Sequence, residues 1–111
     1  MVDPACCYIY VHGWGVAPQG AKYRLMQEHL GPDTQVHSLN WHVPSYAETT
    51  TTAALAALAE YMAAQGKPGQ RWNVVGSSQG GYLAALLAQQ HPELVNRLLL
   101  LCPSFDSMAG W

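Results

Sequence analysis

The sequence has little charge. Of its 111 residues only 11% are charged, and its five lysines and arginines are outnumbered by seven aspartates and glutamates. Because no basic patch results, we expect no nucleic-acid partner. No apolar run approaches the roughly 18 residues that a transmembrane helix needs, and the N-terminal residues lack the basic start of a secretory signal. We therefore expect a cytoplasmic protein with no membrane partner.

Cysteine is also scarce. The chain has three cysteines, and the adjacent Cys6 and Cys7 form neither a disulfide framework nor a CxxC metal spacing. No set of His, Cys, Asp and Glu has a ligand spacing such as HExxH. The sequence therefore predicts no metal and no cofactor, and it favours a reducing compartment.

The hydrophobic pattern alternates between strands and helices. Strands are predicted over residues 6–11, 34–39, 71–75 and 97–101, and helices over residues 20–30, 51–65 and 79–90. This alternation predicts a single three-layer α/β/α domain over residues 1–111 with a parallel sheet. We read its strand order as 2-1-3-4, which places the loops after the first and third strands side by side. Ligands of such sheets bind at the carboxyl ends of the strands, so the loops there are the place to look for a site.

The loop after the third predicted strand reads GSSQGG and contains a GxSxG motif. Gly76 and Gly80 flank Ser78 at the spacing of a nucleophile elbow, a strained strand-to-helix turn that leaves room only for small neighbours. Ser77 would instead place Val75 and Gln79 in those crowded positions, so Ser78 is the predicted nucleophile. The alternative is a Gly-Ser turn or an anion-binding loop, although the lysine of a phosphate loop is missing.

A second element, HGWG, follows the first predicted strand. Acyl transfer passes through an oxyanion that backbone N–H groups stabilise. We expect one donor to be the amide of Gln79, the residue after the nucleophile. The other is expected in the loop that begins at Gly13, from the amide of Trp14.

These segments resemble the α/β-hydrolase superfamily. The stretches YVHGW, WHVPSYAETTTTAAL and GSSQGGYLAALLAQQHPELVNRLLLLCPSFD are most similar to the small bacterial esterases of the YqiA type. The resemblance implies hydrolysis of a small-molecule carboxyl ester or thioester without a cofactor, with Ser78 as the nucleophile and the amides of Trp14 and Gln79 as the oxyanion hole.

The acid and the base of a catalytic triad are harder to place. In this superfamily they follow the nucleophile on later strands, whereas this sequence stops after what resembles strand six of eight, so we expect a truncated fold, incomplete at its C-terminus. His42 is a candidate base, or a residue that lines an acyl pocket beside Trp41, with Trp14 and Tyr46. Asp106 is a candidate acid.

A second function stays open beside hydrolysis. The chain could be an inactive or assembly-dependent fragment that binds an acyl ligand or a partner chain. Its last predicted strand contains four consecutive leucines, from Leu98 to Leu101, and would lie at a sheet edge. Such an edge favours self-association.

Overall fold

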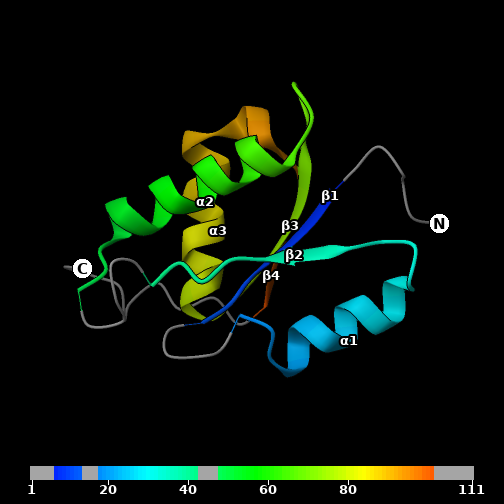
Figure 1. Ribbon diagram of the computed structural model, residues 1–111. Coiled ribbons are helices and arrows are strands. Elements are labelled where there is room, and N and C mark those ends of the chain that lie inside the picture. The colour runs from blue at the N-terminus through cyan, green and yellow to red at the C-terminus, as the bar shows by residue number, and fades with distance from the viewer. Residues whose placement is uncertain (1–6, 14–17, 43–47, 102–111) are drawn as a thin grey trace.

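The computed structural model describes residues 7–13, 18–42 and 48–101 of the chain. Figure 1 shows its elements, which in chain order are β1 (Cys7–Val11), α1 (Ala21–Leu30), β2 (Val36–Ser38), α2 (Thr51–Gln65), β3 (Trp72–Ser77), α3 (Gln79–Gln90), the 3-10 helix η1 (Pro92–Leu94) and β4 (Val95–Leu101).

The strands form one parallel sheet in the order β2-β1-β3-β4. The predicted α/β fold and its strand order are therefore confirmed. Val11 at the end of β1 lies opposite Gly76 of β3, and Gly76 lies opposite Leu100 of β4. Because the strands are parallel and in this register, the loop after β1 and the turn after β3 meet at the same edge of the sheet.

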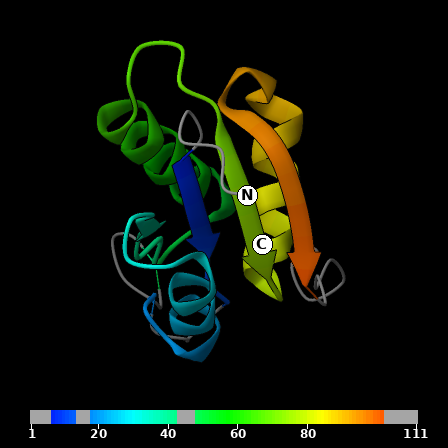
Figure 2. The ribbon, with the colours of Figure 1, turned by 90° about the vertical axis from the view of Figure 1, so that its right-hand side faces the viewer.

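Helices cover both faces of the sheet (Figure 1). On one face α2 and α3 pack with the strands around a buried cluster that includes Ile9, Leu58, Met62, Trp72 and Leu87. On the other face Tyr23, Met26 and Leu30 of α1 pack beside the smaller cluster of Tyr10, Val36 and Val75. Figure 2 shows α1 on the β1 and β2 side of the sheet, away from β4.

Local signals explain why α2 begins and ends where predicted. The Thr50 side chain accepts a hydrogen bond from Ala53 N at 3.1 Å, which caps the first turn. At the other end Gly66 N donates to Met62 O at 3.0 Å. Leu55, Leu58 and Met62 are buried, as their helical spacing predicts.

Several element boundaries differ from the sequence prediction. The second strand is shorter than predicted, and β3 continues through Gly76 to Ser77. The fourth strand begins at Val95 rather than Arg97, because Pro92 starts a 3-10 turn that leads directly into it. The apolar side chains of α1 lie on one stripe that packs beside the sheet, and no residue of this helix is fully buried.

The last strand is the sheet edge that the sequence predicts. In the described part of the chain β4 pairs with β3 alone. Leu98 is 37% exposed and Leu99 is 56% exposed. Both faces of β4 therefore present apolar surface near an unpaired strand edge.

Candidate active site

The turn between β3 and α3 carries the GxSxG motif. Ser78 lies between the last strand residue and the first helical residue, with φ 56° and ψ −122°. Among the described residues it is the one non-glycine residue with a positive φ. Such a backbone conformation costs about 1–3 kcal/mol and is concentrated at functional sites. The strain that the motif predicts is present at Ser78.

Backbone hydrogen bonds fix this turn on two sides. Ser78 N donates to Leu101 O of β4 at 3.1 Å, and Gly81 N donates to Ser78 O at 2.9 Å. The first bond ties the turn to the neighbouring strand, and the second begins α3. Ser78 is consequently held, half-buried, at the carboxyl end of the sheet.

Two glycines make the turn sterically possible. A Cβ on Gly76 would lie 2.5 Å from Gly80 O and 2.8 Å from the Cβ of Ala84. A Cβ on Gly80 would overlap the carbonyl oxygens of Val11 and His12. The start of α3 therefore approaches β1 and β3 so closely that only glycine fits at these two positions.

The loop after β1 lies directly beside the turn. A Cβ on Gly13 would be 3.5 Å from the Cβ of Ser78 and 3.6 Å from Ser77 O, which are ordinary contact distances. The structure thus brings the start of the HGWG loop to the candidate nucleophile. Trp14, the residue expected to donate the second oxyanion hydrogen bond, lies outside the described residues.

The hydroxyl of Ser78 has a hydrogen-bond partner of its own. Oγ donates to Oε1 of Gln79 at 2.8 Å. The same Oε1 is 3.7 Å from the Cβ position of Gly13, so the carboxamide lies where the two loops meet. In the described chain the hydroxyl is bonded to Gln79 and not to His42. The motif singled out the backbone amide of Gln79, and nothing in the sequence indicated this role of its side chain.

A buried tryptophan supports the loop after β1. Trp41 is fully buried, and its Nε1 donates to the carbonyl oxygen of His12 at 2.8 Å. The rings of Trp41 and His12 stack with their centroids 5.2 Å apart. The hydrogen bond to the His12 carbonyl satisfies the N–H of this buried indole. The expectation that Trp41 lines an acyl pocket is corrected accordingly.

Two histidines, His12 and His42, lie against the ring of Trp41. His12 is fully buried, and its Nδ1 is 2.8 Å from Gly13 O, which fits the structural role of a residue in this loop. Burial lowers the pKa of His12, hydrogen bonding to the backbone of Gly13 and of Leu39 opposes that shift, and the nearby His42 adds to it. His42 is half-buried, its ring meets that of His12 edge-on at 4.9 Å, and burial lowers its pKa.

The remaining candidates lie away from this edge or cannot be placed. Asp106 and Tyr46 lie outside the described residues. His37 Nδ1 is 2.9 Å from the hydroxyl of Tyr61, and its ring packs against Trp72, which is a structural environment. Within the described ranges no group of three or more His, Cys, Asp or Glu could hold a metal ion. No helix there is long and apolar enough to cross a membrane.

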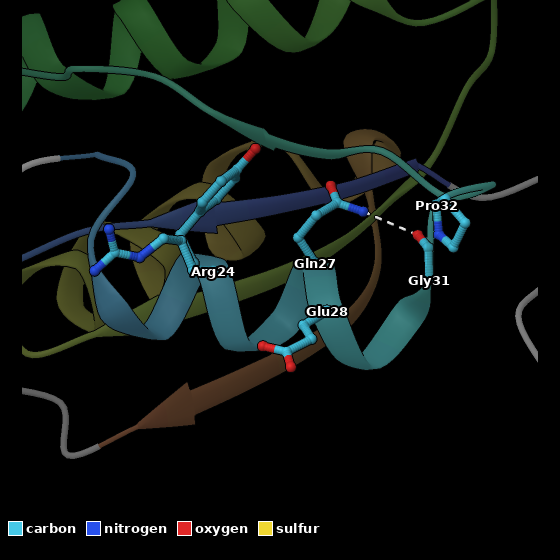
Figure 3. A pocket seen from close by; sticks show the side chains of 6 residues that line it. Arg24, Gln27, Glu28, Gly31 and Pro32 are labelled. Atoms are coloured by element: carbon cyan, nitrogen blue, oxygen red, sulfur yellow. Dashed lines mark hydrogen bonds between the residues drawn. The ribbon is translucent and has the colours of Figure 1, made fainter.

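An open hollow of about 430 Å³ beside α1 is separate from this site (Figure 3). Its lining comes from Tyr23, Arg24, Gln27, Glu28, Gly31 and Pro32. Gln27 is already engaged, because its Nε2 donates to Gly31 O at 3.0 Å and its Oε1 accepts from Val36 N at 2.8 Å. The hollow includes the C-terminal end of α1, near the start of β2, whereas Ser78 lies at the carboxyl end of β3.

Known proteins resemble this chain over most of its length. Proteins named pimeloyl-(acyl-carrier protein) methyl ester esterase from Salmonella heidelberg, Salmonella agona and Salmonella enteritidis are each 31% identical to it. Each alignment covers 96% of this chain but 41% of the relative, so the chain spans less than half the length of these relatives. A family profile described as the alpha/beta hydrolase fold matches residues 9–111, and the chain therefore belongs to the α/β-hydrolase family.

Proposed function

We propose that the chain carries the nucleophile of a serine hydrolase that cleaves a carboxyl ester or a thioester. The observation that supports this most is the backbone of Ser78, which has a positive φ between two glycines that admit no Cβ. Strain of this kind persists only where the surrounding structure imposes it. The similarity to proteins named as methyl ester esterases supports an ester as the substrate class.

The chemistry follows from the proposed roles. Oγ of Ser78 attacks the acyl carbon, and the backbone amides of Gln79 and Trp14 bind the oxyanion that forms. As the tetrahedral intermediate collapses, the bond from the acyl carbon to the leaving oxygen or sulfur breaks, and the leaving group departs with the proton taken from Ser78. Water then hydrolyses the acyl-serine, which releases the acid and restores the hydroxyl.

A base has to accept the proton of Ser78. Oε1 of Gln79 accepts a hydrogen bond but is not basic enough to take a proton at neutral pH. In this family the acid and the base follow the nucleophile along the chain. Asp106 follows Ser78 and is kept as an alternative acid. His42 precedes Ser78 and so departs from that order, but its ring packs against His12, and we keep it as an alternative base.

We also propose a cytoplasmic location. Cys7 is a free thiol in the described part of the chain. Burial raises the pKa of Cys7, while the charge of Lys67 lowers it in part. A protonated, partly buried thiol of this kind is a packing residue that a reducing compartment preserves.

The nucleophile is tested with a fluorophosphonate probe and mass spectrometry of the adduct. In the labelling reaction a bond forms between Oγ and phosphorus, the phosphorus–fluorine bond breaks, and fluoride leaves while the hydroxyl proton passes to solvent. We expect the adduct on Ser78, because the GxSxG turn presents this serine as the nucleophile. Ser78→Ala should abolish the adduct.

Ser77→Ala is the matched control for this experiment. Ser77 is the neighbouring serine and is 6% exposed, so its replacement should leave the labelling of Ser78 intact. An adduct on Ser77, or equal labelling after Ser78→Ala, would overturn the proposal. Complete absence of an adduct would favour the alternative of a noncatalytic domain that binds an acyl ligand or a partner chain.

A further inference from the structure

The side chain of Gln79 lies at the centre of the candidate site. It is half-buried at the first position of α3, directly after Ser78. Its Oε1 accepts a hydrogen bond from the hydroxyl of Ser78 at 2.8 Å. The same oxygen is 3.7 Å from the position of a Cβ on Gly13, across the junction between the two loops.

This hydrogen bond determines where the hydroxyl proton points. A serine hydroxyl has a single proton, so donation to Gln79 excludes donation to a base. A carboxamide oxygen accepts a hydrogen bond from the hydroxyl but is not basic enough to take its proton. While this hydrogen bond is present, Ser78 keeps its proton, and the hydroxyl points to Gln79 at the start of α3 rather than to a base.

The same side chain also fills space that the reaction needs. One proposed oxyanion donor is the backbone amide of Gln79, so an acyl oxygen has to reach the start of α3 beside Oγ of Ser78. The carboxamide of Gln79 lies beside that Oγ and extends toward Gly13. Substrate and carboxamide would compete for this position.

We infer that the Gln79 side chain is a positioning group that holds Ser78 in a resting orientation and is displaced when an acyl group binds. This inference rests on the proposed function of Ser78. Gln79 thus has two separable roles in the site. Its backbone amide stabilises the reacting oxyanion, while its side chain restrains the nucleophile until substrate enters.

Two substitutions separate the hydrogen bond from the occupied space, and both retain the backbone amide. Gln79→Met keeps a side chain of similar length but removes the acceptor oxygen. Gln79→Ala removes the acceptor and the bulk together. Gln90→Ala is the matched control, because it makes the same replacement at the exposed far end of α3.

The measurement is the rate of fluorophosphonate labelling of Ser78 as a function of probe concentration, which yields a limiting rate and a half-saturating concentration. Gln79→Met should raise the limiting rate about two- to tenfold, the range expected for one neutral hydrogen bond. Gln79→Ala should raise that rate similarly and should also lower the half-saturating concentration. Gln90→Ala should change neither value, and circular dichroism should show all variants folded.

The outcomes distinguish this inference from the proposed function. If Ser78 is labelled in the parent but Gln79→Met and Gln79→Ala react at the same rate or more slowly, the restraining role of Gln79 is wrong while the nucleophile stands. If the adduct persists after Ser78→Ala, the proposed function is wrong and this inference is lost with it. A purely structural role of Gln79 would lower stability without raising the labelling rate.

Discussion

The two faces of the sheet are packed very differently. The face under α2 and α3 contains fully buried large side chains, among them Trp41, Trp72 and Leu58. The face under α1 contains a cluster of three buried residues, and α1 itself has no fully buried residue. α2 and α3 therefore contribute much more buried apolar surface than α1 does, and burial of such surface is the main stabilising term in folding.

The candidate site belongs to the densely packed face. Gly80 brings α3 against the carbonyl oxygens at the end of β1, and Trp41 binds one of those oxygens from within the core. From the α1 face, the described contact with Ser78 is the backbone hydrogen bond to Leu101 O of β4, whose side chain packs beside the smaller cluster. We therefore expect substitutions in the core under α2 and α3 to disturb the site, and substitutions under α1 to leave it largely unchanged.

The largest effect is expected at the junction of α3 and β1. Gly80→Val would force a branched side chain into the carbonyl oxygens of Val11 and His12. Because these are backbone atoms, they cannot move aside without displacing β1, and we expect a loss of about 4 kcal/mol in the free energy of unfolding. Thermal denaturation followed by circular dichroism measures this loss.

Ala56→Val is the control for this substitution. It introduces the same side chain on the exposed side of α2, where the cost is limited to the lower helix propensity of valine, about 0.5 kcal/mol. A melting temperature for Gly80→Val within about 2 °C of the parent would mean that α3 does not approach β1 as closely as described.

A matched pair of methionines compares the two faces directly. Met62 of α2 is 1% exposed, whereas Met26 of α1 is only partly buried. Met62→Ala should cost about 2–3 kcal/mol in the free energy of unfolding, because it leaves a cavity in close-packed surroundings. Met26→Ala should cost about 1 kcal/mol or less. Equal losses in urea denaturation would contradict the difference between the faces.

Sequence reasoning predicted the features that depend on periodicity and on steric rules. The alternation of strands and helices predicted the parallel sheet, and the bounds of α2 and α3 agree with the prediction. The strand order followed from the need to place the loop after β1 beside the turn after β3. The glycines around Ser78 predicted a strained turn, because a nucleophile elbow leaves room only for small residues at both positions. The spacing of these glycines is a local signal, although the atoms that exclude a Cβ at Gly80 belong to β1 and the loop after it.

The features that sequence reasoning missed depend on long-range contacts. Trp41 follows a strand and precedes an irregular segment, so we expected a pocket residue, but its side chain is fully buried and its indole donates to the carbonyl of His12. The spacing in α1 indicates an apolar stripe, but the depth to which that stripe is buried depends on how far the helix covers the sheet. The contact of Gln79 with Ser78 depends on a side-chain rotamer that no spacing encodes.

The buried His12 should make the stability of the packed face depend on pH. Burial lowers the pKa of His12, and it also lowers those of His37 and His42. Below the ordinary histidine pKa of about 6.5 the unfolded chain takes up protons that the folded chain resists. Stability should therefore be fully present above that value and should fall as the pH decreases toward the lowered folded-state pKa.

Urea denaturation between pH 7.5 and 5.5, about one unit either side of the ordinary histidine pKa, measures this dependence. His12→Gln removes the most buried of the three titrating groups, so its stability should vary less with pH than that of the parent. An equal or steeper dependence in His12→Gln would show that His12 is not the group that resists protonation.

The smallest effect on folding, and the clearest effect on association, is expected at Leu99. Leu99 pairs with Val75 of β3 and therefore lies on the α1 side of the sheet. It is 56% exposed, so β4 presents an apolar side chain to solvent on the face that α1 covers only in part. We expect the protein to self-associate through this edge, because an apolar edge strand offers unpaired backbone groups to another strand. Leu99→Lys should reduce the mass measured by light scattering at high concentration and change the free energy of unfolding by about 0.5 kcal/mol or less. Leu25→Lys is the matched control, since Leu25 is 64% exposed but lies on a helix, where no strand can pair. A parent that stays monomeric at every concentration, or an equal response to Leu25→Lys, would show that the edge of β4 does not drive association.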